Sequence, residues 1–277
     1  MVTAAASQRP RPDFSDPPVI EVALSVGFPA LERYTSAHAG LFWQRAKGTF
    51  STTEEHPPFD IPAVTEATES ARPKMRVVDG APPLRTWLVT PDGGELLQLQ
   101  RDVFAHNWRK TAPAQPYPRY EAVRARFENH FRAFQAFAQE ENLGTVEPQR
   151  CDVTYVNHVP VGDLLRTAGD LQELVVPWSW PHAAFLPKPD RVLFSSEFVI
   201  RDESGKFGGR LTVDAKPAYR RSDRSGIIVL SLTARGIPLG AGIDGALAFF
   251  DLGREWIVRG FADLTTPKMH ALWGRSR

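Results

Sequence analysis

The side chains best suited to acid–base chemistry alternate with apolar residues along two stretches, 95–109 and 191–235. Such alternation is typical of strands that have helices on one face and an open second face. A carboxylate and a histidine on one surface can move a proton, and a guanidinium can hold an anion. If the protein is an enzyme, we therefore expect its groups to be Asp102, His106, Glu197 and Arg235.

The same residue types raise the question of a metal site. The seven histidines form no H-x-x-x-H or H-E-x-x-H pair, and Cys151 is the single cysteine. Two histidines and two aspartates could still meet across the open face and hold a divalent ion: His106, His158, Asp102 and Asp152. Ordinary hydrogen-bonded side chains are the simpler interpretation, so we predict no metal and no cofactor.

Two further kinds of catalytic or ligand site have little support in the sequence. Residues 236–245 are glycine-rich and enter a predicted helix, but they lack the lysine of a phosphate-binding P-loop, so a flexible connection is the simpler reading. No G-x-S-x-G elbow occurs, and Cys151 falls on the predicted core face of a strand, where a small apolar residue is expected.

A binding surface is the alternative that the polar face and an aromatic insert favour. The proline-rich insert 175–190 contains two tryptophans, a residue type enriched at interfaces. The residues that we expect to bind a ligand or partner are Gln98, Gln100, Phe104, Trp108, Trp178, Trp180, Arg210 and Thr212. The face could equally be a homodimer contact or a solvated surface, and the insert could fold back as a lid.

One carboxylate lies in an unusual place. Glu21 falls within the strongly apolar strand 19–28, where an unpaired charge is costly. Arg109 is the candidate partner, and we expect the pair to be structural rather than catalytic.

The order of elements predicts an α+β fold made of two like halves. Each half reads as strand, helix, irregular insert, three strands and helix. The expected strands are 19–28, 73–79, 84–90, 95–109, 151–159, 191–202, 207–217 and 226–235. The expected helices are 30–47, 162–174, 244–264 and one that has Pro118 in its first turn and Gly144 just past its end. The inserts 51–72 and 175–190 fall at the same place in both halves, which favours an internal duplication over two unrelated halves.

The predicted organisation has three parts. Residues 1–16 form a disordered lead-in, 17–147 the first half and 148–277 the second half of one pseudo-symmetric domain. Antiparallel sheets with helices on one face are similar to TATA-binding-protein and helix-grip folds, which is a likeness of fold alone.

Composition narrows the class of protein. The 277 residues are 42% hydrophobic, yet no run approaches the length of a membrane span and no secretory signal is evident. A single cysteine fits a reducing cytoplasm. The net charge of +1 does not suggest nucleic acid. Nucleic-acid binding would require the local cluster Lys216, Arg220, Arg221 and Arg224 to join Arg201, Arg210 and Arg235 in one stripe.

Several motifs together resemble one protein family. They are Pro17-Pro18-Val19-Ile20-Glu21-Val22, the run 97–109 with its Leu-Gln-Leu-Gln and Asn-Trp-Arg segments, Tyr117-Pro118-Arg119-Tyr120, Thr154-Tyr155-Val156-Asn157 and Leu264-Thr265-Thr266-Pro267. The chain resembles a sporadically distributed family of uncharacterised bacterial proteins. The resemblance covers nearly the whole chain after the lead-in and implies an association with mobile or defence genes. It carries over no catalytic residue.

These patterns lead to one main hypothesis and two alternatives. The main hypothesis is a non-enzymatic cytoplasmic binding or adaptor protein, whose partner is encoded in the same operon. The first alternative is an enzyme that processes a small ligand or nucleotide in the saddle between the halves, and the second is nucleic-acid binding. An enzyme requires its polar groups to converge in a deep pocket, whereas a binding module requires a broad surface with hydrophobic anchors.

Overall fold

The computed structural model describes residues 10–59, 62, 64–66, 84–162, 165, 167, 169–179 and 185–276. In this part the chain is α+β, with one nine-stranded antiparallel sheet in the order β2-β3-β4-β5-β1-β6-β9-β8-β7. The strands are β1 Val19–Gly27, β2 Thr52–His56, β3 Arg85–Val89, β4 Glu95–Gln100, β5 Val103–Arg109, β6 Arg150–Pro160, β7 Phe194–Arg201, β8 Phe207–Tyr219 and β9 Gly226–Gly236. The described helices are α2 Ser36–Ala46, α3 Tyr120–Glu140, α4 Gly242–Leu264 and α5 Pro267–Leu272.

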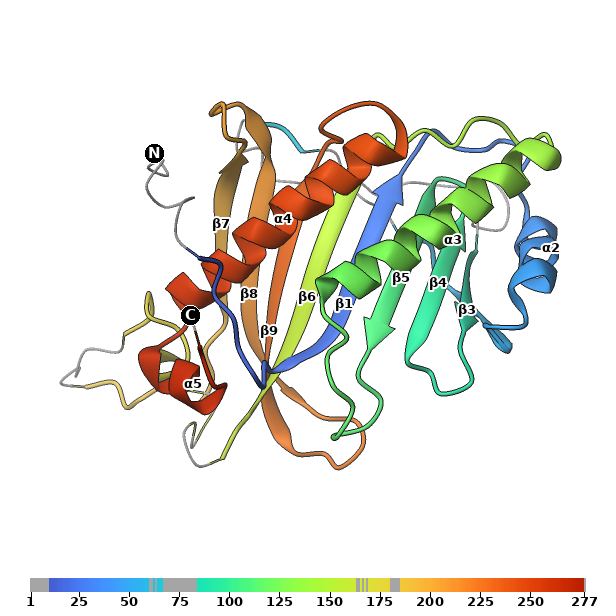
Figure 1. Ribbon diagram of the computed structural model, residues 1–277. Coiled ribbons are helices and arrows are strands. Elements are labelled where there is room, and N and C mark those ends of the chain that lie inside the picture. Colours follow the sequence, from blue (N-terminus) through green and yellow to red (C-terminus); the bar gives the residue numbers. More distant parts are fainter. Residues whose placement is uncertain are drawn as a thin grey trace.

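Two long helices cover one face of the sheet. Figure 1 shows α3 and α4 running diagonally across the same side, with α2 beyond the β3 end of the sheet. The apolar stripe of α3 follows the 3.6-residue helical period and faces the strands. All its large members are buried: Tyr120, Val123, Phe127, Phe131, Phe134 and Phe137.

The core beneath these helices is aromatic. The ring of Phe104 on β5 lies 5.8, 5.4 and 5.3 Å from the rings of Phe127, Phe131 and Phe134. Phe127 also meets Phe250 of α4 edge to face, with the ring centroids 4.9 Å apart. Buried aromatic side chains dominate the energy of such cores, so this cluster holds both helices to the sheet.

The predicted strand 95–109 is wrong, because it is a hairpin. Arg101 and Asp102 form a turn between β4 and β5, and the register pairs Leu99 with Phe104 and Leu97 with His106. Directly opposed residues in an antiparallel pair point to the same face. Phe104, His106 and Trp108 therefore lie on the helix side with the leucines, and not on the open face where the alternation placed them.

Other elements depart from the prediction in smaller ways. The insert 51–72 contributes a strand, β2, to the edge of the sheet, and the predicted strand 73–79 lies outside the described residues. The predicted helix 162–174 is described only in part, and there it includes the short 3-10 turn Leu171–Glu173. The short helix α5 was not predicted. The remaining strands and the helices α3 and α4 are confirmed to within a few residues, whereas α2 begins at Ser36 and not at residue 30 as predicted.

The end of the lead-in is packed rather than disordered. The amides of Ser15 and Asp16 donate to the carbonyls of Gly274 and Trp273, each at 3.1 Å. Phe14 is 6% exposed and its ring lies 5.4 Å from that of Phe261. Apolar burial together with backbone pairing thus orders this segment against the C-terminal residues.

None of the helices in the described part of the chain combines the length and the apolarity that a membrane crossing requires.

Removing one ring from the aromatic core should be costly. Phe131 is fully buried and contacts both Phe104 and Phe127, so Phe131→Ala should lower the free energy of unfolding by about 3–5 kcal/mol. Chemical denaturation measures this change. Leu41→Ala on α2, where the side chain is 48% exposed, is the control and should cost less than about 1 kcal/mol. Equal effects of the two substitutions would contradict the assignment of this core.

Candidate functional site

The open face is the side of the sheet opposite α3 and α4. Cross-strand partners carry one row of polar residues across its centre, from Ser25 on β1 to Asp152, Arg235 and Arg210 on β6, β9 and β8. A second row contains Thr154, Thr233, Thr212 and Glu197. The predicted inward and outward alternation of β8 and β9 is thus confirmed, because Leu211, Val213 and Leu232 are buried on the helix side.

An ion pair between Arg235 and Asp152 occupies the middle of this face. The guanidinium Nε donates to Oδ1 at 2.8 Å and Nη2 donates to Oδ2 at 2.6 Å. Asp152 is 3% exposed. Burial raises the pKa of the Asp152 carboxyl, while the hydrogen bond and the charge of Arg235 act against that rise. The arginine therefore keeps a carboxylate in a place where an unpaired charge is costly.

Arg210 fastens a second segment to the open face. Its Nη1 donates to Glu197 at 2.8 Å, while Nε and Nη2 donate to the carbonyls of Thr65 and Glu66 at 3.1 and 2.8 Å. Gln100 makes a matching contact on β4, where it exchanges two hydrogen bonds of 2.8 and 2.9 Å with the backbone of Phe59. The insert before β3 is thus anchored over β4 and over β8, and four strands lie between these points. The open face is not the bare saddle that the sequence suggested.

A second polar network fills the β4–β5–β1 end of the open face. Gln98 donates to Asn107 at 2.8 Å, and Asn107 donates to the carboxylate of Glu21 at 2.5 Å. Burial raises the pKa of Glu21, opposed by the Asn107 hydrogen bond and by the charge of Arg109. Arg109 stands directly opposite Glu21 in the β1–β5 register, so the expected neighbour is present. The direct hydrogen bond, however, comes from Asn107.

The four candidates for acid–base chemistry do not meet. Asp102 lies in the β4–β5 turn, where it accepts a hydrogen bond of 2.6 Å from Gln100. His106 is fully buried on the helix side, and its Nε2 lies 3.2 Å from Glu95. Glu197 and Arg235 are on the open face, on strands that β8 separates. His106 is separated from Glu197 and Arg235 because the turn at residues 101–102 puts it on the helix side of the sheet.

The candidate metal ligands are also dispersed. His106 and Asp152 lie on opposite faces, and His158 stands six residues along β6 from Asp152, beside Val229 of β9. Within the described ranges, no group of three or more His, Cys, Asp or Glu residues has a geometry that could hold a metal ion.

The predicted binding residues divide into three groups. Phe104 and Trp108 belong to the core, and Trp178 is partly buried against it. Gln98, Gln100 and Arg210 are buried in the polar contacts of the open face, and Thr212 is half-buried there. Trp180 lies outside the described residues. The face is therefore mostly engaged with its own chain, which the alternation of residues alone could not indicate.

The positions of the charged residues do not favour nucleic-acid binding or a phosphate site in the glycine-rich loop. The basic residues Arg220, Arg221 and Arg224 lie at the β8–β9 hairpin, and Arg220 pairs with Asp223 at 3.0 Å. Along β8 the acidic Asp214 stands between Lys216 and Arg210, so the predicted basic stripe is interrupted. In the glycine-rich loop, the amide of Gly242 donates to the carboxylate of Glu147 at 2.7 Å and is occupied.

Four large hydrophobic side chains are exposed on the edge strand β7 and on the segment that precedes it. We call this set the β7 edge surface and define it by Phe185, Leu186, Leu193 and Phe198, which are 93%, 58%, 64% and 38% exposed. The segment that carries the first three leads into β7 at the end of the sheet (Figure 1). None of these four residues was among the predicted binding residues, because alternation does not reveal which strand is at an edge.

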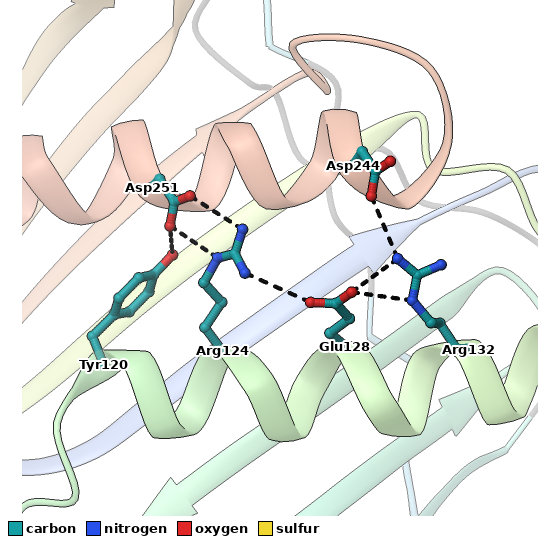
Figure 2. A network of polar contacts seen from close by, with 6 residues as sticks. All are labelled: Tyr120, Arg124, Glu128, Arg132, Asp244 and Asp251. Carbon is teal, nitrogen blue, oxygen red and sulfur yellow. Dashed lines mark hydrogen bonds and ion pairs between the residues drawn. The ribbon is translucent and has the colours of Figure 1, made fainter.

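Helix α3 is tied to α4 by a line of charged contacts (Figure 2). Arg124 donates from Nε and Nη2 to Asp251 at 3.0 and 3.2 Å, and the hydroxyl of Tyr120 donates to the same carboxylate at 2.7 Å. Arg132 bridges Glu128 and Asp244 further along. Each exposed pair contributes little by itself, so we assign this line to helix packing rather than to a site.

Searches against models of known protein families, curated protein sequences and solved structures found no match for this chain. The resemblance to the bacterial family stays a prediction.

Removing Arg235 should expose the cost of burying Asp152. In Arg235→Met the carboxylate loses its bidentate partner, and we expect a loss of about 3 kcal/mol at pH 8. Burial raises the pKa of Asp152 in the folded state above its unfolded value. The protonated carboxyl is therefore tolerated at low pH, and the loss should shrink as the pH falls toward 4. Urea denaturation at several pH values measures this dependence.

The control for this experiment is Arg201→Met, which breaks the exposed pair with Glu66. We expect it to cost less than about 1 kcal/mol at every pH. A loss in Arg235→Met that does not depend on pH would contradict the proposed role of Asp152.

Proposed function

We propose that this protein is a non-enzymatic binding or adaptor protein that docks a protein partner at the β7 edge surface. The observation that carries the proposal is the set of four large, exposed hydrophobic side chains beside a strand with one free edge. Large apolar side chains that the fold leaves exposed are candidates for contact with a partner.

The edge of β7 supports this proposal. β7 hydrogen-bonds to β8 on one side, and no described strand follows it on the other. Its unpaired backbone groups can accept a strand from a partner, which is a common mode of peptide recognition. The opposite edge strand, β2, carries the exposed Glu54 and Glu55, and charges of this kind discourage edge pairing.

The exposed side chains would supply the hydrophobic contribution to binding. Burying a leucine or phenylalanine side chain contributes about 1.5–3 kcal/mol, and a few such anchors dominate most interfaces. Phe198 stands opposite Leu211 and so lies on the helix side of β7, whereas Glu197 and Thr212 lie on the open face of the same edge. A partner strand added to β7 would therefore lie near both of these faces.

The polar groups of the open face give less support to the enzyme hypothesis. Asp152, Glu197, Arg210 and Arg235 are paired with one another, and Arg210 also binds two backbone carbonyls. An enzyme of the predicted kind requires Asp102 and His106 to join Glu197 and Arg235 in one pocket. Their separation favours a binding role.

We further propose that the two halves arose by duplication. The sheet order is consistent with this, because β1 and β6 begin the two halves and adjoin at the centre, while β5 and β9 end them and flank the centre. Each of these flanking strands is followed by a helix, α3 or α4, on the same face. The likeness to TATA-binding-protein or helix-grip folds belongs to this proposal, as does a partner encoded in the same operon of a bacterial defence system.

A comparative pull-down tests the docking surface. Tagged wild-type protein should retain a stoichiometric partner from lysate of its native cells, and the double variant Phe185→Ser/Leu186→Ser should retain at least tenfold less. Leu272→Ser on α5, where the side chain is also 58% exposed, is the matched control and should retain the partner. Quantitative mass spectrometry of the eluates measures the ratio.

Two outcomes would overturn this proposal. A partner that the double variant retains at the wild-type level would remove the β7 edge surface from the interface. A bound metabolite without any protein partner would favour an enzyme or small-ligand protein instead.

A further inference from the structure

A small hollow lies between α4, the end of the lead-in and the helix side of the sheet. Its volume is about 80 Å³. Figure 1 shows the lead-in passing beside α4 before it enters β1. The hollow is far smaller than a nucleotide site, but it has room for several water-sized groups.

The inner wall of this hollow is apolar. It is formed by Val19 of β1, Leu232 of β9, and Ile257 and Phe261 of α4, with Phe14 of the lead-in. These side chains are largely buried, and they present carbon atoms to the hollow. An apolar group of a few carbon atoms would gain free energy by leaving water for this wall.

The polar end of the hollow contains two tyrosine hydroxyls and an ion pair of 3.0 Å between Arg119 and Asp13. The hydroxyls of Tyr117 and Tyr155 lie 3.0 Å apart. Burial is the main reason that the pKa of each phenol is raised, to about 12 for Tyr155, so both hydroxyls keep their protons near neutral pH. Their mutual hydrogen bond uses one proton, and the second remains available to an acceptor.

Arg254 adds a cation to the same end. Its guanidinium is 18% exposed, and its one ion pair among the described residues is with Glu121, a side chain that is itself 68% exposed. The Nε atom is buried and has no hydrogen-bond partner in the described part of the chain. Because this atom is closed off from water-sized groups, a ligand would meet the guanidinium at its terminal nitrogens, of which Nη1 pairs with Glu121 at 3.1 Å.

A second hollow also has Arg254 in its lining. Arg11, Arg124 and Arg254 line it with Tyr120 and the carboxylates of Glu121 and Asp251. Arg254 therefore lines both hollows, one largely apolar and the other largely charged. This order of environments suits a molecule with a charged head and a short apolar body.

We propose that this hollow binds a small organic acid. The carboxylate would accept hydrogen bonds from Arg254 and from a tyrosine hydroxyl of the Tyr117–Tyr155 pair, and its short aliphatic chain would lie against Leu232 and Ile257. Arginine favours carboxylate because its planar guanidinium presents paired donors. This site is separate from the β7 edge surface, so it stands or falls independently of the proposed docking function.

Butyrate is a suitable probe, and butyramide is its uncharged counterpart of similar shape. NMR titration of the full chain at pH 7 should show saturable shifts with butyrate, with a roughly millimolar dissociation constant for so small a ligand. Butyramide should bind at least tenfold more weakly. Arg254→Met should weaken butyrate binding at least tenfold, whereas the control Arg132→Met, on the outer side of α3, should leave it unchanged.

A second variant keeps the test decisive if Arg254→Met does not fold. Val258 is half-buried at the border of the hollow, so Val258→Trp should fill the space and abolish binding without removing a core residue. Absence of saturable binding by the wild type would overturn the proposal. It would also be overturned by equal binding of butyrate and butyramide, or by butyrate binding that Val258→Trp does not reduce.

Discussion

The rest of the structure depends on the antiparallel pairing of β1 with β6. This pairing joins the first strand of the chain to a strand that comes after α3, and it forms the middle of the sheet. Contacts between residues so distant in the sequence carry a high entropic cost, which burial must repay. Val22, Leu24 and Val26 supply that burial on the helix side, opposite Tyr155, Val153 and Cys151. Once this pair is formed, β5 and β9 extend the sheet outward on either side.

The two faces of the sheet are stabilised by different kinds of interaction. On the helix side, rings from β5, α3 and α4 interlock, and the energy is that of apolar packing. On the open face, the buried groups are polar, and each depends on a specific partner: Asp152 on Arg235, Glu21 on Asn107, Gln100 on the backbone of Phe59. Loss of one partner there leaves a buried polar group without a hydrogen bond, so the stability of the open face depends on each of these pairs.

The polar groups that stabilise the fold can be distinguished from the groups that could bind a partner or a ligand. The ion pairs of the open face satisfy one another and hold the insert before β3. By contrast, the side chains of the β7 edge surface are exposed to water among the described residues, and the guanidinium of Arg254 lines two hollows. Exposed apolar side chains can gain free energy by contact with a partner, and a guanidinium beside an apolar wall can hold the carboxylate of a small ligand.

The sequence by itself determined the α+β class, the presence of α3 and α4, the core position of Cys151 and the alternation along β8 and β9. Each of these follows from the spacing of apolar residues within single helices and strands, which does not depend on the neighbouring elements. It also indicated that Glu21 would need a partner and that Arg109 would be near.

Only the tertiary structure decided which residues share a face. The turn at Arg101 and Asp102 reversed the assignment of Phe104, His106 and Trp108, because alternation continues through a short hairpin turn as if the strand were unbroken. The edge position of β7, the engagement of Arg210 with residues 65 and 66, and the meeting of Tyr117, Tyr155 and Arg254 all arise from segments far apart in the chain. Local patterns contain no information about such meetings, since strand order and helix docking are set by packing of the whole domain.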